Sequence, residues 1–124
     1  FWMVDPRGGN IGGCCLSIRL ADYARMGQFA LEGGASVVPD GWFAEAGKAQ
    51  VEFGPQAPGF GYGYQWWAYP MGSYGAQGIF GQAITLVPAK NLVVAIVSNW
   101  PTATSPGGRA DAREVVAKIA LTAE

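Results

Sequence analysis

Two apolar runs joined by a turn occupy residues 82–98, which read QAITLVPAKNLVVAIVS. Residues 82–87 alternate apolar and polar side chains, and residues 92–98 are almost continuously apolar, with many β-branched side chains. Both patterns are typical of strands. The intervening residues 88–91 (PAKN) are few enough for a tight hairpin. The stretch therefore predicts two antiparallel strands that are neighbours in one sheet.

A third strand is predicted upstream, where residues 62–69 are rich in aromatic side chains. The compact turn sequence at residues 70–73 (PMGS) follows it, so its connection to the hairpin is short. Residues 54–63 carry Pro and Gly with little periodicity and are expected to form a loop. We expect a three-stranded antiparallel sheet.

Helical spacing of apolar residues predicts three helices, over residues 17–31, 41–48 and 111–121. Ser17 and Asp40 are expected to be the N-caps of the first two, and Gly33 lies just past the end of the first. We expect the last helix to pack on the sheet. The fold class is α+β, a three-stranded antiparallel sheet with flanking helices, in one unit over residues 1–124.

Composition excludes several classes of protein. The formal net charge is −1 and the 8 Lys and Arg residues are scattered, which argues against a nucleic-acid or anionic-lipid partner. The longest apolar run, residues 92–97, is far shorter than a membrane-spanning helix, so we expect a soluble protein of either cytoplasmic or periplasmic location. Histidine is absent, which removes a Ser-His-Asp triad and nearly all catalytic zinc sites, and no cofactor or metal is expected.

Two adjacent cysteines, Cys14 and Cys15, follow a glycine-rich stretch. Neighbouring residues rarely reach disulfide geometry without strain, so the sequence favours free thiols in the core. A reactive or metal-binding role is the alternative.

Three ordered motifs carry a family resemblance. Residues 12–17 (GGCCLS) and 20–27 (LADYARMG) resemble a glycine-rich loop and a D-x-A-R-F-G helix, and residues 61–67 (GYGYQWW) resemble a G-Y-G-x-x-W-W strand. Residues 75–82 (GAQGIFGQ) resemble the G-x-x-G-x-x-G-Q element of 6-aminohexanoate-dimer hydrolases and related esterases. Together they are similar to the C-terminal end of the SxxK serine hydrolases, the class C β-lactamase and esterase group with the β-lactamase/transpeptidase-like α/β fold.

The resemblance implies acyl transfer on a small-molecule amide or ester, through a Ser activated by a Lys three residues later. No Ser here has Lys at its third following position, and no Tyr begins a Y-x-N element. The Lys-Thr-Gly element is also missing, its place taken by residues 78–80 (GIF). The chain starts at Phe1 in a segment that reads as mid-domain. We therefore expect the N-terminal half of the fold to supply the nucleophile, and this segment alone to be inactive.

What the segment supplies, by the same resemblance, is the backbone N–H of Ile79 as an oxyanion-hole donor on an outer strand. Gly78 and Gly81 are expected to let substrate approach this strand closely. Phe80 stands where relatives often carry a polar residue such as His, so an apolar wall is expected. Bulges or plain sheet packing are the alternative reading of the glycines. For the whole chain the alternative is a binding module or a non-catalytic remnant of the same fold.

Overall fold

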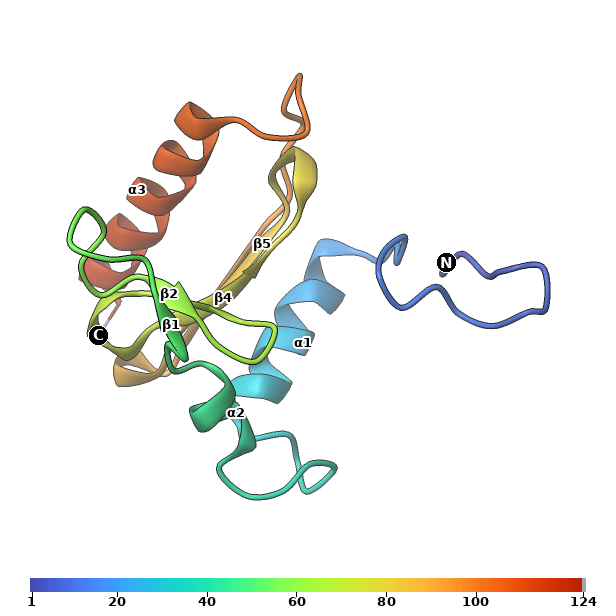
Figure 1. Ribbon diagram of the computed structural model, residues 1–124, viewed down its shortest axis with the longest axis horizontal. Helices are drawn as coiled ribbons and strands as arrows, with labels where there is room; N and C mark the ends of the chain where they lie inside the picture. Colours follow the sequence, from blue (N-terminus) through green and yellow to red (C-terminus); the bar gives the residue numbers. More distant parts are fainter. Residues whose placement is uncertain (124) are drawn as a thin grey trace.

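The computed structural model of the chain describes residues 1–123 (Figure 1). Its helices and strands, in chain order, are α1 (Leu20–Leu31), α2 (Trp42–Ala46), β1 (Val51–Glu52), β2 (Gly61–Tyr62), β3 (Trp67–Ala68), β4 (Tyr74–Gln77), β5 (Ala83–Val87), β6 (Leu92–Ile96) and α3 (Pro106–Thr122). Three 3-10 turns, η1 (Pro70–Gly72), η2 (Ile79–Gly81) and η3 (Pro88–Lys90), lie between strands.

The strands form one antiparallel meander in the order β1-β2-β3-β4-β5-β6, so the expectation of three strands is wrong. The predicted β5–β6 hairpin is present, and Thr85 pairs with Val94 at its centre. The predicted strand over residues 62–69 is broken by a turn in which the Gly63 N–H donates to the Trp66 carbonyl at 2.7 Å. Strands β1, β2 and β3 have two residues each, too few to show an alternation in the sequence.

Helices cover both faces of the sheet (Figure 1). On the α1 face, β5 contributes Ile84 and Leu86 to a buried core that also contains Tyr74 and Ala30. Partly buried hydrophobic side chains surround this core: Tyr23, Leu31, Phe43, Trp66 and Val93. On the opposite face, an apolar groove of about 480 Å³ separates much of α3 from β4 and β5. The molecule therefore has one tightly packed face and one loosely packed face.

Close packing of α1 on the sheet depends on Gly27, which is buried. A Cβ added to Gly27 would lie 2.4 Å from Cγ1 of Val93 and 2.7 Å from Cγ2 of Ile84. Both distances are well inside van der Waals contact, so the helix axis approaches the sheet more closely than any larger residue would permit.

The helix ends differ from the sequence expectation in their caps. α1 begins at Leu20 after Arg19, and α2 begins after Gly41, and neither has a side-chain cap, so the assignments of Ser17 and Asp40 are wrong. Past the end of α1 the chain turns at Gly33, whose φ of 81° is the left-handed conformation that ends many helices. The α3 helix starts at Pro106, earlier than predicted, because the Ser105 hydroxyl accepts from the amide of residue 108 and caps it.

Residues 1–17 extend away from the body of the molecule (Figure 1). Two isolated bridges, Trp2 with Leu16 and Val4 with Asn10, hold this segment in a hairpin-like shape. Among the helices of residues 1–123, none combines the length and apolar character needed to cross a bilayer.

Candidate active site

Strand β4 leads directly into the predicted site. It lies inside the sheet between β3 and β5, so the expectation of an outer strand is wrong. However, β3 pairs only with Tyr74 and Gly75 and then ends. Residues 76–79 run past that end, and no strand of residues 1–123 lies beside them on the β3 side, although β5 still pairs with Gln77 on the other side. The chain therefore has a local edge just where the sequence placed the donor.

Gly78, Ile79 and Phe80 follow β4, and the backbone N–H groups of Gly78 and Phe80 donate hydrogen bonds within the protein. The Gly78 N–H donates to the carbonyl of Gln82 at 2.8 Å, and the Phe80 N–H donates to the carbonyl of Ala103 at 3.0 Å. Ile79 is the first residue of the 3-10 turn, so its N–H has no acceptor within that turn. Within residues 1–123 the Ile79 N–H donates no hydrogen bond, and the residue is 60% exposed. This amide is free to bind an external oxygen atom.

A hollow of about 640 Å³ lies beside this amide. Its walls come from the loop before α1, from α1 itself and from the end of β4 with the turn after it: Gly13, Cys14, Cys15, Leu16, Tyr23, Ala76, Gln77, Gly78, Ile79, Phe80, Gln82, Ala83 and Ile84. Tyr23 is the one titratable side chain in this lining, because the two cysteines are bonded to each other. The hollow thus offers a backbone donor and apolar walls, and its lining contains no Ser, Lys or carboxylate.

The four predicted site residues do not all share this hollow. Gly78, Ile79 and Phe80 line it, and Phe80 adds an apolar wall. Gly81 is buried and lies outside it, with a φ of 92°. A Cβ on Gly81 would lie 2.6 Å from both Cε2 of Trp100 and Cβ of Ser98. Glycine at position 81 is therefore required by the backbone conformation and by packing, and we do not retain it as a substrate contact.

The cysteines are joined in a disulfide, so the expectation of free thiols is wrong. Cys14 and Cys15 are bonded to each other across adjacent residues, and both are exposed at the rim of the hollow. Cys15 has a φ of 75°, and this left-handed turn is part of the backbone path that brings the two sulfur atoms together.

This pairing predicts the result of a thiol-trapping experiment. Without reductant, denatured protein is expected to take up no maleimide, and after reduction it should take up two per chain, because the chain has 2 cysteines in total. Intact-mass spectrometry measures both numbers. Two adducts without reductant would mean that the thiols are free.

Sequence reasoning missed the residues that support the turn from behind, Gln77, Trp100 and Arg109. Arg109 donates a hydrogen bond to the Gln77 side chain, across 32 positions of sequence. Nothing in the local pattern indicates this contact. The only sequence signal was the loop over residues 99–108, whose Pro and Gly content is typical of functional loops.

No group of three or more His, Cys, Asp or Glu side chains in residues 1–123 is arranged to hold a metal ion. A comparison with curated proteins finds no match. The family model described as Beta-lactamase matches residues 13–118, which is most of the chain and includes the helix, the sheet and the turn described above. The chain therefore belongs to the beta-lactamase family, whose fold supports acyl transfer of the serine-hydrolase kind.

Proposed function

We propose that this chain forms one wall of the active site of a serine hydrolase that acts by acyl transfer on amide or ester bonds. In this proposal the Ile79 N–H stabilises the oxyanion of the tetrahedral intermediate. The nucleophilic Ser and its Lys base come from a part of the fold that this sequence does not contain. Among members of the family, the 6-aminohexanoate-dimer hydrolases are the proposed relatives in activity, because of the GAQGIFGQ element at residues 75–82.

One observation carries the proposal: within residues 1–123 the Ile79 amide is unpaired, on a residue that is 60% exposed and lines a hollow, while the amides on both sides of it are engaged. A backbone N–H left free at a local sheet edge is preorganised, because the turn holds it in place before any ligand binds. Such a donor contributes roughly 3 to 4 kcal/mol to transition-state stabilisation when water is excluded.

A binding or interaction module that has lost its chemistry is the competing proposal. The observation in its favour is that the lining of the hollow contains no Ser, Lys or carboxylate. The two proposals differ in what the gene encodes upstream. An S-x-x-K element followed by a Tyr element about a hundred residues later would favour the hydrolase. The absence of these elements would favour the binding module.

The chain by itself is expected to hydrolyse neither p-nitrophenyl butyrate nor the linear 6-aminohexanoate dimer, because it lacks the Ser and Lys pair. The longer protein is expected to hydrolyse at least one of them and to be labelled by a fluorophosphonate on a serine upstream of Phe1. Peptide mapping of the labelled protein measures this. A labelled serine within residues 1–124, or no labelling and no hydrolysis by the longer protein, would count against the proposed function.

A further inference from the structure

The turn that carries the Ile79 amide is tied to α3 and to the loop before it, on the side of the sheet away from the hollow. The backbone supplies the first tie, since the Phe80 N–H donates to the Ala103 carbonyl and the Trp100 N–H donates to the Phe80 carbonyl at 3.4 Å. Two hydrogen bonds to one residue fix both the position and the direction of the peptide groups around it. The orientation of the Ile79 amide therefore depends on where this loop lies.

The indole ring of Trp100 supplies the second tie. A Cβ built on Gly81 would lie 2.6 Å from Cε2 of Trp100, and one built on Gly108 would lie 2.7 Å from the same atom. The ring therefore packs directly against the backbone of the turn on one side and against the first turn of α3 on the other. Because Gly81 and Gly108 have no side chains, the Trp100 ring contacts their backbone atoms directly. A movement of the ring would therefore move the backbone of η2.

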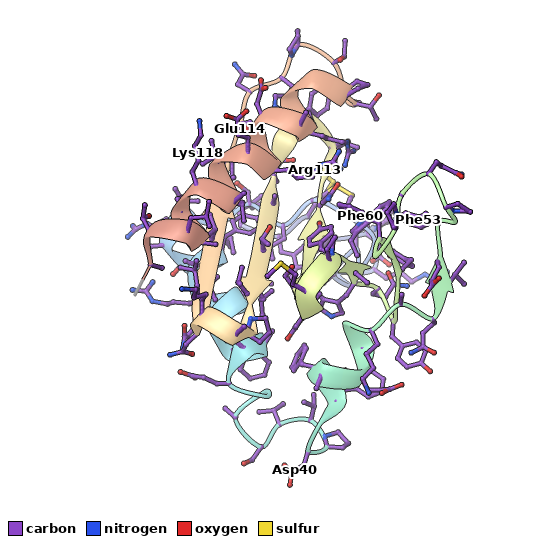
Figure 2. All side chains as sticks on the ribbon, turned by 90° about the vertical axis from the view of Figure 1, so that its left-hand side faces the viewer. Asp40, Phe53, Phe60, Arg113, Glu114 and Lys118 are labelled. Atoms are coloured by element: carbon purple, nitrogen blue, oxygen red, sulfur yellow. A yellow bond between two sulfur atoms is a disulfide. The ribbon has the colours of Figure 1, made fainter. Side chains whose placement is uncertain are left out.

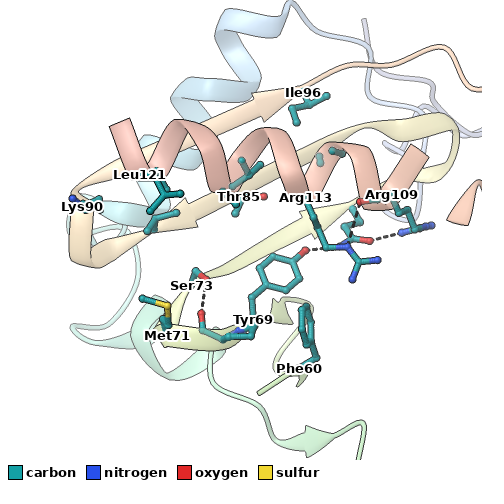
Figure 3. A pocket seen from close by; sticks show the side chains of 18 of the residues that line it. Phe60, Tyr69, Met71, Ser73, Thr85, Lys90, Ile96, Arg109, Arg113 and Leu121 are labelled. Atoms are coloured by element: carbon teal, nitrogen blue, oxygen red, sulfur yellow. Dashed lines mark hydrogen bonds between the residues drawn. The ribbon is translucent and has the colours of Figure 1, made fainter. Parts of the chain in front are cut away.

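Arg109 connects these parts. Its guanidinium lies 5.7 Å from the centre of the Trp100 ring and donates to the side-chain oxygen of Gln77. Gln77 in turn donates to the Tyr69 hydroxyl at 2.5 Å. Burial raises the pKa of the Tyr69 phenol, so this acceptor stays uncharged at neutral pH. Figure 3 shows Arg109 and Tyr69 at the two ends of this chain of hydrogen bonds.

We propose that Arg109 is a positioning residue for the Ile79 amide, and that it acts through Gln77 at the end of β4 and through the Trp100 ring. This inference rests on the proposed function of that amide. Arg109 does not line the hollow. Arg109 holds both Gln77, the last residue of β4, and Trp100 in the loop before α3. In this way it keeps the Ile79 N–H directed at the position of the oxyanion.

Arg113 provides a matched control. It lies one helical turn further along α3, and its guanidinium is 5.7 Å from the Phe60 ring (Figures 2 and 3). Neither its cation–π contact nor its hydrogen bond to the Arg109 carbonyl involves residues 77–81. Arg113→Met removes the same charge from the same helix, and it removes neither a hydrogen bond nor a cation–π contact to the turn, although the charge of Arg113 also lowers the pKa of the Tyr69 phenol.

The experiment compares Arg109→Met with Arg113→Met in the longer protein that carries the nucleophile. Arg109→Met is expected to lower kcat about tenfold with KM nearly unchanged, less than the roughly 100-fold that a 1 Å misplacement can cause. Arg113→Met is expected to leave both near wild type. The double variant Arg109→Met with Gln77→Leu should lose less than the sum of the two single effects, because each single change already removes the hydrogen bond between Arg109 and Gln77.

A second readout does not depend on activity. Amide hydrogen exchange measured by NMR should be faster at Phe80 in Arg109→Met than in wild type or in Arg113→Met, and the amide shift of Ile79 should move in Arg109→Met alone. Equal effects of the two variants, or unchanged kcat and unchanged amides in Arg109→Met, would overturn the inference. If the wild-type longer protein shows no hydrolysis and no acylation, the proposed function fails, and the NMR comparison then decides by itself whether Arg109 holds the turn.

Discussion

If the chain belongs to the longer, nucleophile-bearing protein of the proposed function, replacing Ile79 with proline is expected to lower kcat of that protein about 100- to 1000-fold, the loss found when one oxyanion-hole donor is removed. Proline lacks the N–H, and little else in the local backbone needs to change. Phe80 has φ 60° and ψ 14°, close to the third residue of a type II turn, and proline is common at the second position of such turns, which Ile79 occupies. Gly78 before it has φ −104° and ψ 168°, an extended conformation suited to the residue preceding proline. Steady-state kinetics with p-nitrophenyl butyrate measures the effect.

Ile79→Ala is the matched control for this substitution. It removes most of the exposed side chain and keeps the N–H, so kcat is expected to stay within about threefold of wild type. Unfolding curves of both variants should lie close to wild type, because the Ile79 side chain is 60% exposed. Near-normal kcat in Ile79→Pro would show that the amide takes no part in catalysis, and an equal loss in Ile79→Ala would assign the effect to the side chain.

The parts of the fold that could be predicted from the sequence have long, regular patterns. The β5–β6 hairpin and α1 show their periodicity over many residues, and both are present. Strands of two residues show no periodicity, so β1 and the division between β2 and β3 could not be read. The extended conformation of β4, with Gly75 at its second position, comes from pairing with β5 and not from β propensity.

The candidate site also has a part that the sequence pattern indicates and a part that it does not. The sequence motif at residues 75–82 marks the turn that holds the free Ile79 amide, because motifs are local; the role of this amide as an oxyanion-hole donor stays a prediction. The support from Trp100 and Arg109 is tertiary, and no pattern near either residue indicates that they meet Gly81 and Gln77. The disulfide was missed because a general rule about adjacent cysteines outweighed the turn at Cys15, whose φ of 75° could not be known from the sequence.

Gly27→Ala is expected to destabilise the protein by about 1 to 3 kcal/mol, although helix propensity alone favours alanine over glycine by about 1 kcal/mol. The added methyl would lie 2.4 Å from Val93 and 2.7 Å from Ile84. Both neighbours are β-branched and stiff about χ1, so neither side chain can rotate away cheaply. The helix would have to move outward, which would loosen the packing of α1 on β5 and β6. Urea unfolding followed by Trp fluorescence measures the free energy of unfolding.

Gly107→Ala tests whether the sign of this effect comes from packing. Gly107 also lies in a helix, in the first turn of α3, and a Cβ there has no neighbour within 4 Å. Propensity then acts without opposition, and the variant is expected to be as stable as wild type or up to about 1 kcal/mol more stable. The same substitution should thus have opposite effects in the two helices. If Gly27→Ala were also stabilising, α1 would have to lie farther from the sheet than the structure places it.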